Sequence, residues 1–176
     1  MKKENNLKKI LVIGCCGAGK STFSKKLQSV LKLEVIHLDQ YYHKPNWEEP
    51  EEEEWEKTVN KLVKKPSWIM DGTYIESLDK RIEKCDTVIY LDYSILKCFF
   101  RVVKRVFADY GKKRSDMAPG CKEEFDLEFL KYVLNFNSKN RNNILKRLKG
   151  LNQNKQIYIF RNDKQADKFL KEVEIN

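Results

Sequence analysis

Eight residues near the start of the chain, GCCGAGKS at positions 14–21, constrain its fold more than any other feature. They fit the pattern GxxxxGK(S/T) and carry a further glycine at Gly17. The glycines let consecutive main-chain N–H groups turn toward a single anion. An apolar run, Ile10–Ile13, precedes the motif, and a segment with helical spacing, Ser21–Leu31, follows it. Because this is the strand–loop–helix context that the motif needs, we predict a phosphate-binding loop here.

The motif gives each of its groups a role. The main-chain amides are expected to surround the β-phosphate of a nucleoside triphosphate, and the helix that starts near Lys20 adds the positive end of its dipole. Lys20 is expected to reach the β- and γ-phosphates, and the hydroxyl of Ser21 to ligate Mg²⁺. We therefore predict that the chain binds ATP with Mg²⁺. The predicted nucleotide-binding residues are Gly14, Cys15, Cys16, Gly17, Ala18, Gly19, Lys20, Ser21 and Thr22.

Five apolar runs rich in Val, Ile and Tyr predict the strands: Ile10–Ile13, Val35–Leu38, Trp68–Met70, Thr87–Leu91 and Gln156–Phe160. Their continuous apolarity is typical of parallel strands that are covered on both faces. Segments with helical spacing separate several of them, at 21–31, about 50–64 and 95–108. This alternation predicts a doubly wound α/β fold. The chain has 176 residues, the size of one ordinary domain, so we predict a single domain over 1–176.

The segment Tyr110–Glu123 breaks this alternation. It is polar, contains Gly111, Pro119 and Gly120, and separates two predicted helical regions, 95–108 and 125–148, the second of which reads as one or two helices. Long loops in compact domains are commonly lids or binding elements. We therefore predict a lid at about 110–123.

Three aspartates directly follow apolar runs: Asp39, Asp71 and Asp92. Each is expected at the carboxyl edge of the sheet, where such a domain places the acidic groups that hold Mg²⁺ or the acceptor. Asp71 is followed by Gly72, which permits a close approach of substrate. An aspartate after a strand also caps the next helix readily, and for Asp92 capping is the favoured interpretation. We predict catalytic and acceptor-binding roles for Asp39 and Asp71, and water-mediated Mg²⁺ binding for Asp71.

Arginines gather around the predicted lid. Arg101 and Arg105 lie four residues apart on one helical face, and Arg114 lies in the loop. Guanidinium groups match the charge that spreads over a transferred phosphoryl group, so we predict catalytic roles for these three. Surface ion pairs are the alternative for any single arginine. The predicted acceptor-binding residues are Asp39, Asp71, Gly72, Tyr74, Arg81 and Arg141.

The net charge is +9, and it is unevenly distributed. Seven glutamates fall within 48–56, so the rest of the chain carries +16, which favours anionic partners such as phosphates, nucleotides or nucleic acid. The five cysteines form no CxxC pair, which is typical of reduced thiols in the cytosol. No apolar stretch approaches the length of a membrane span. We therefore predict a cytoplasmic protein with no membrane partner.

Four blocks of the sequence resemble the bacterial topology modulation proteins, a family of adenylate-kinase-like P-loop proteins. These blocks are GCCGAGKS, HLDQYYHKPNW, WIMDGTY and RSDMAPGC with the helix that follows it to Arg141. The resemblance covers roughly residues 8–148. It implies a nucleoside-monophosphate-kinase type of fold, a five-stranded parallel sheet with a lid.

The resemblance also bears on individual residues. The strand-end Asp-Gly turn supports Asp71, and the arginine-rich helix and lid support Arg101, Arg105 and Arg114 as residues that hold ATP. Adenylate kinases continue that turn as FPR, whereas Thr73 follows Gly72 here, so their AMP-binding arginine is not carried over. The block around Trp47 also differs from the monophosphate-binding segment of adenylate kinases.

Two functional hypotheses remain open at this stage. The first is a kinase that moves the γ-phosphoryl group of MgATP to a small molecule or nucleotide, with Asp39 orienting or deprotonating an acceptor hydroxyl. The second is an ATP-binding regulatory protein associated with DNA topology or gene expression, which the charge outside 48–56 favours. No helix-turn-helix, zinc finger or RNA-binding signature occurs in the sequence, so the kinase is preferred.

Overall fold

The computed structural model describes residues 7–151 and 155–175. Across these residues one parallel sheet of five strands runs in the order β2-β3-β1-β4-β5. The strands are β1 (Lys9–Gly14), β2 (Val35–His37), β3 (Trp68–Asp71), β4 (Thr87–Leu91) and β5 (Gln156–Phe160). The prediction of an α/β fold with a five-stranded parallel sheet is confirmed. The predicted single domain includes residues 1–6, 152–154 and 176, which lie outside the described residues, and stays a prediction.

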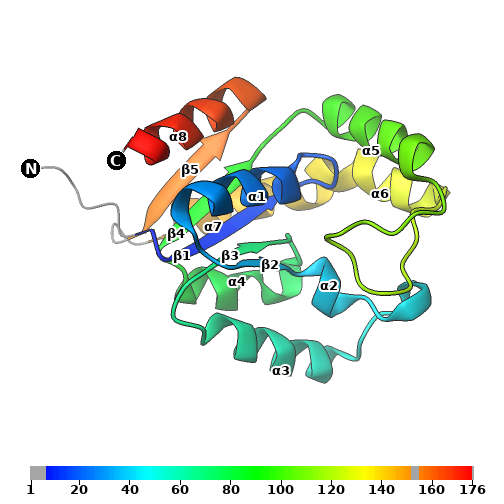
Figure 1. The fold of residues 1–176 in the computed structure, drawn as a ribbon, viewed down its shortest axis with the longest axis horizontal. Helices are drawn as coiled ribbons and strands as arrows, with labels where there is room; N and C mark the ends of the chain where they lie inside the picture. The colour runs from blue at the N-terminus through cyan, green and yellow to red at the C-terminus, as the bar shows by residue number, and fades with distance from the viewer. Residues whose placement is uncertain (1–6, 152–154, 176) are drawn as a thin grey trace, which may run out of the picture.

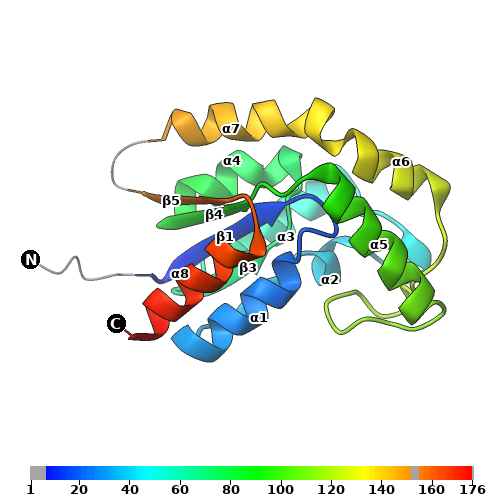
Figure 2. The same cartoon turned by 90° about the horizontal axis from the view of Figure 1, so that it is seen from above.

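Helices flank the sheet on both sides. Figure 2 shows α1 and α8 against one face, and α4 and α7 against the other. The sheet's central strand, β1, is therefore covered on both sides, and Ile10–Ile13 are completely buried. The helices are α1 (Lys20–Leu31), α2 (Asp39–Tyr42), α3 (Glu52–Val63), α4 (Ile75–Lys84), α5 (Ile95–Asp109), α6 (Leu127–Phe136), α7 (Asn142–Lys149) and α8 (Asp163–Ile175).

The carboxyl ends of the strands meet at one end of the molecule. Asp71 is aligned with Val12 of β1 on one side and with His37 of β2 on the other. Because all strands are parallel, the connections that leave these ends share one edge. Figure 1 shows α2, α5 and the connection at 110–123 gathered at this end. The fold therefore brings the phosphate-loop motif and the strand-end aspartates to one place.

The helical prediction missed α4, the helix between β3 and β4. Its sequence IESLDKRIEK offers only Leu78 and Ile82 as buried apolar side chains, and its other buried side chains are the polar Ser77 and the charged Arg81. A charged residue inside the apolar stripe hides the helical period. The expectation of one or two helices over 125–148 is met by α6 and α7, which a π-helical turn, η2 (Asn137–Arg141), joins into a continuous run.

The segment 110–123 folds onto the 3-10 turn η1 (Pro45–Trp47) rather than standing away from the body. The indole Nε1 of Trp47 donates to the carbonyl of Lys122 at 3.1 Å, and Gly120 packs against Pro45. The thiol of Cys121 donates to the carbonyl of Lys44 at 3.2 Å. The segment therefore lies across the end of the sheet that carries the strand-end aspartates.

Candidate active site

The phosphate-loop motif links β1 to α1 in a conformation that depends on its glycines. Gly17 has a φ of 80°, and a Cβ atom there would collide with the carbonyl oxygen of Cys98 in α5. Only glycine both adopts this positive φ without strain and leaves room for the carbonyl oxygen of Cys98. Helix α1 begins at Lys20 and has no acidic residue in its first turn, so the positive end of its dipole is not neutralised from within the helix. The loop therefore has the geometry of an anion site.

Lys20 lies at the floor of a cleft. Its Nζ donates to the carbonyl of Cys15 at 3.2 Å. Burial lowers the pKa of this ammonium group, but the charges of Cys16, Asp39 and Asp71 outweigh burial and hold the pKa above its ordinary value. Lys20 is therefore a fixed positive charge that faces two carboxylates.

The cleft has a volume of about 1250 Å³. Pockets for a single small ligand usually measure roughly 300–1,000 Å³, so this one has room for a nucleotide and a second molecule. Cys15, Arg81 and Arg141 are the predicted site residues absent from its lining. The predicted residues that line it are Gly14, Cys16, Gly17, Ala18, Gly19, Lys20, Ser21, Thr22, Asp39, Asp71, Gly72, Tyr74, Arg101, Arg105 and Arg114.

Asp71 ends β3 with its side chain almost completely buried. The Nδ1 atom of His37 lies 3.0 Å from both of its carboxylate oxygens. Burial lowers the pKa of His37, and the hydrogen bond and charge of Asp71 outweigh it, so the pKa is raised. Gly72 follows with a φ of 131°, and a Cβ there would lie 2.8 Å from the Cβ of Leu38. The Asp-Gly turn therefore depends on its glycine.

Asp39 is the first residue of α2 and accepts a hydrogen bond from the hydroxyl of Tyr74 at 2.6 Å. Tyr74 has an unusual positive φ of 29° for a non-glycine residue. Burial and the nearby Asp39 carboxylate raise the pKa of Tyr74, so its hydroxyl remains a donor. This bond orients Asp39, which lines the cleft and whose charge acts on Lys20.

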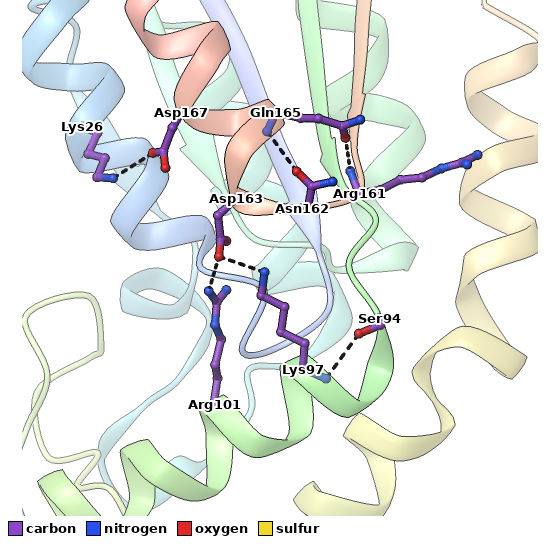
Figure 3. Close-up of polar contacts among 9 residues, drawn as sticks. All are labelled: Lys26, Ser94, Lys97, Arg101, Arg161, Asn162, Asp163, Gln165 and Asp167. Atoms are coloured by element: carbon purple, nitrogen blue, oxygen red, sulfur yellow. Dashed lines mark hydrogen bonds and ion pairs between the residues drawn. The ribbon is translucent and has the colours of Figure 1, made fainter.

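Arg101 reaches from α5 toward the phosphate loop. Its Nη1 lies 3.7 Å from where a Cβ of Gly19 would stand, and its Nη2 donates to Asp163 at 2.8 Å. Figure 3 shows Arg101 and Lys97 converging on Asp163 at the start of α8. There Asn162 accepts from the main-chain N–H of Gln165 at 3.1 Å, which caps the helix and fixes the position of Asp163.

The other two predicted arginines share a buried carboxylate. Arg105 donates to Glu123 at 2.8 Å, and Arg114 lies 3.6 Å from the same carboxylate. Arg114 also pairs with Asp116 at 3.4 Å. The carboxylate of Asp116 accepts a hydrogen bond from Ser21; burial raises its pKa, but Arg114 and this bond hold the pKa below its ordinary value. The segment 110–123 is thus tied directly to the phosphate loop.

Arg81 does not have the predicted acceptor-binding position. It is completely buried, and its guanidinium donates to the carbonyls of Gly72, Thr73 and Tyr74 at 2.5–2.7 Å, and to that of Ser77 at 3.3 Å. All of these acceptors belong to the turn after β3 or the start of α4. The donors that an acceptor anion would need are therefore used to hold the Asp-Gly turn.

Arg141 also lies outside the predicted acceptor-binding site. Its Nε and Nη2 atoms donate to the two carboxylate oxygens of Asp92, each at 2.7 Å. This fork-to-fork pair lies at the end of β4, and Asp92 is buried there. Asp92 does not cap α5, since the hydroxyl of Ser94 accepts the N–H of Lys97 instead. Arg141 therefore connects the α6–α7 region to the sheet.

Several site residues escaped the sequence interpretation. Asp163 lies three residues after the last apolar run, at the same carboxyl edge as the three aspartates that were considered. Extending that rule to β5 would have found it. Thr73 binds the phosphate loop, since its hydroxyl donates to the carbonyl of Gly14 at 2.6 Å. Glu123 and Asp116 do not follow an apolar run, so no sequence signal indicated their role. Only the folding of the segment 110–123 brings them to Arg105 and Arg114.

The oxygen donors near Lys20 fit Mg²⁺. The hydroxyl of Ser21 and the carboxylate of Asp71 both line the cleft. Within residues 7–151 and 155–175, no three His, Cys, Asp or Glu side chains converge as a metal site. Mg²⁺ at phosphate sites keeps several waters and needs only one or two protein oxygens. Over the same residues no helix is long and apolar enough to cross a bilayer.

No family model matches the chain, and no curated protein matches it. Solved structures do. The chain is similar to shikimate kinase from Bacteroides thetaiotaomicron, with 16% identity, a TM-score of 0.58, and coverage of 94% of this chain and 95% of that one. A shikimate kinase from Acinetobacter baumannii, in complex with shikimate, gives 18% identity, a TM-score of 0.59, and coverage of 96% and 91%.

A third similar structure is deoxyadenosine kinase from M. mycoides with the products dCMP and dCDP bound. It has 17% identity, a TM-score of 0.51, and coverage of 94% of this chain and 98% of that chain. At these identities the similarity establishes the fold that these kinases share, and neither an activity nor a substrate. The resemblance to topology modulation proteins stays a prediction.

Proposed function

We propose that the protein is an ATP-dependent kinase, which moves the γ-phosphoryl group of MgATP to a hydroxyl of a small acceptor. The observation that carries this proposal is the position of Asp39. Its carboxylate faces Lys20 of the phosphate loop across one cleft of about 1250 Å³. A donor site and a base for the acceptor thus share one cavity, as direct phosphoryl transfer needs.

The donor half of this cleft is cationic. The main-chain amides of 14–21 and the ammonium group of Lys20 would hold the β- and γ-phosphates of ATP. Arg101, Arg105 and Arg114 all line the same cleft and would neutralise the charge that develops on the transferred group. Ser21 would ligate Mg²⁺ directly and Asp71 through water, and the ion when bound supplies charge neutralisation between the β- and γ-phosphates.

The transfer itself needs one proton acceptor. An oxygen of the acceptor hydroxyl bonds to the γ-phosphorus, the bond from that phosphorus to the β–γ bridging oxygen breaks, and ADP leaves. The hydroxyl proton passes to Asp39, whose carboxylate already holds one hydrogen bond from Tyr74 that fixes its direction. The segment 110–123 covers the phosphate loop through Asp116 and would exclude water from the transferred group.

Lys20→Ala tests the proposal. We expect MgATP binding to weaken by at least about tenfold and acceptor-stimulated ADP release to be lost, because charge-assisted phosphate contacts contribute about 1.5–3 kcal/mol each. Calorimetry measures the first and a coupled ADP assay the second. Lys64→Ala, an exposed lysine that does not line the cleft, is the matched control. An unchanged ATP affinity in Lys20→Ala would contradict the proposal.

A further inference from the structure

The acceptor half of the cleft has a chemical character of its own. We use this name for the part that Asp39, Tyr42, Trp47, Glu49, Tyr74 and Glu76 line. These residues belong to α2, η1, the segment after η1 and the start of α4. The acceptor half therefore comes from connections at the carboxyl ends of β2 and β3, separate from the phosphate loop and α5.

Aromatic rings form one wall of the acceptor half. The ring centroids of Tyr42 and Tyr74 lie 4.5 Å apart, and Trp55 packs behind them at 5.0 and 5.1 Å. Trp55 is buried, so the two tyrosine rings are held in place from behind. Trp47 adds a further ring, which is fixed by its hydrogen bond to the carbonyl of Lys122. Such rings present electron-rich faces to a bound molecule.

Carboxylates stand beside these rings. Glu49 holds a hydrogen bond with the hydroxyl of Tyr42, and Asp39 accepts one from Tyr74. Glu76, on the first turn of α4, acts electrostatically on both Tyr42 and Tyr132, so it faces the same space. In the described part of the chain, Asp39, Glu49 and Glu76 form no ion pair with any lysine or arginine. Their negative charge is therefore directed at the cleft.

Lysine and arginine side chains are missing from the acceptor half. His43 also lines the cleft there, and burial lowers its pKa, which favours the neutral ring. Within the described ranges, the lysines and arginines that line the cleft are Lys20, Lys25, Lys26, Arg101, Arg105 and Arg114. All of these come from α1, α5 or the segment 110–123.

The basic residues nearest the acceptor half are engaged elsewhere. Arg81 donates to the main-chain carbonyls of the turn after β3, and Lys44 pairs with Glu54 at 2.7 Å. Arg147 donates to the carbonyl of Ile75 at 3.0 Å. A phosphate or carboxylate on the acceptor would meet Glu49 and Glu76 without a countercharge here, because Lys20 faces only Asp39 among these three carboxylates, and this is unfavourable. A protonated amine would meet both the carboxylates and the ring faces.

We propose that the acceptor is an alcohol that carries a protonated amine and no phosphate or carboxylate group. Its hydroxyl lies against Asp39, and its ammonium group lies at the faces of Tyr42 and Tyr74 with Glu49 and Glu76 as counterions. This inference rests on the proposed kinase function and narrows its acceptor by charge. It predicts that the protein does not phosphorylate a nucleoside monophosphate or a hydroxy acid.

The test is a set of matched acceptors that differ in charge. Acceptor-stimulated ADP release is measured with MgATP for glucosamine, glucose and glucuronic acid, for ethanolamine, ethylene glycol and glycolate, and for cytidine and CMP. We expect transfer to an amine-bearing member, with kcat/KM about tenfold above its neutral analogue, which a partly exposed cation–aromatic contact and ion pairs with the two glutamates together give. Preference for a phosphate- or carboxylate-bearing member overturns the inference and leaves the kinase function standing.

A double variant, Glu49→Gln with Glu76→Gln, tests the site itself. We expect the KM of the amine acceptor to rise by about tenfold or more, while the KM of its neutral analogue and the affinity for ATP change less than about twofold. Glu52→Gln with Glu174→Gln removes two exposed carboxylates that do not line the cleft and is the control. Equal effects on amine and neutral acceptors overturn the inference.

The two proposals fail in different ways. If calorimetry detects no MgATP binding, the kinase function falls and this inference falls with it. If MgATP binds and no member of any charge class stimulates ADP release, the kinase function is again overturned, together with the acceptor assignment. If transfer occurs but favours an anion, only the inference is lost.

Discussion

The carboxylate of Asp163 lies 2.8 Å from Nη2 of Arg101 and 2.8 Å from Nζ of Lys97, which joins the start of α8 to α5 (Figure 3). Arg101 also reaches the phosphate loop beside Gly19. The arginine that we propose to hold the phosphates is therefore aimed by a carboxylate from the last helix. Because that pair is half exposed, its contribution to folding is expected to be small and dependent on pH.

The first prediction concerns Asp163→Asn. Burial raises the pKa of Asp163, but Lys97 and Arg101 outweigh it and hold the pKa below its ordinary value. A carboxylate with a lowered folded-state pKa stabilises the fold above its unfolded pKa of about 3.9, and this stabilisation is lost as pH falls through the folded value. We expect the variant to be less stable by at most about 1 kcal/mol at pH 7, with the difference shrinking as pH falls below about 4. Urea unfolding at pH 7, 5 and 3 measures this, and a difference that stays constant with pH would contradict it.

Most of the fold was predictable because its signals are local. Each strand is a continuous apolar run, and a buried parallel strand needs no long-range information to be recognised. The phosphate loop was equally accessible, since its spacing and its strand–loop–helix context both lie within Ile10–Leu31. Asp39 and Asp71 followed from the rule that parallel strands end at one edge.

The wrong assignments share a physical cause. Arg81 and Arg141 were read as ligands of the acceptor because arginine suits phosphate, yet sequence spacing does not reveal which acceptor a guanidinium meets in the fold. Main-chain carbonyls take the donors of Arg81, and Asp92 takes those of Arg141. Glu123 was missed for the same reason, because its partners Arg105 and Arg114 are 18 and 9 positions away.

The second prediction is that Arg81→Met destabilises the protein without altering acceptor recognition. Methionine retains much of the side-chain volume but leaves the carbonyls of Gly72, Thr73 and Tyr74 without their buried donor. We expect a loss of about 2–4 kcal/mol in the free energy of unfolding, measured by urea denaturation. Arg81→Lys should recover part of it. An unchanged stability together with a tenfold rise in acceptor KM would restore the ligand role that the structure does not support.

The third prediction addresses DNA. Although the chain outside 48–56 carries +16, several of its lysines are paired with glutamates of 48–56, such as Lys44 with Glu54 and Lys80 with Glu56. We expect only non-specific duplex binding, with Kd on the order of 10⁻⁴–10⁻⁶ M at physiological salt. A fluorescence anisotropy titration at several salt concentrations measures it. Nanomolar affinity with a steep salt dependence would favour the regulatory hypothesis over the kinase.

The last prediction is that Glu123→Gln increases the affinity for ATP. The buried carboxylate of Glu123 neutralises Arg105 and Arg114, so incoming phosphates must compete with it for the same two guanidinium groups. Glutamine retains the shape and an acceptor oxygen but removes the charge. We expect the Kd for MgATP to fall roughly five- to tenfold, which corresponds to about 1 kcal/mol. Calorimetry measures this, with Glu52→Gln, an exposed glutamate that does not line the cleft, as the control. A weaker Kd in Glu123→Gln alone would mean instead that the carboxylate positions the arginines for the phosphates, rather than competing with them.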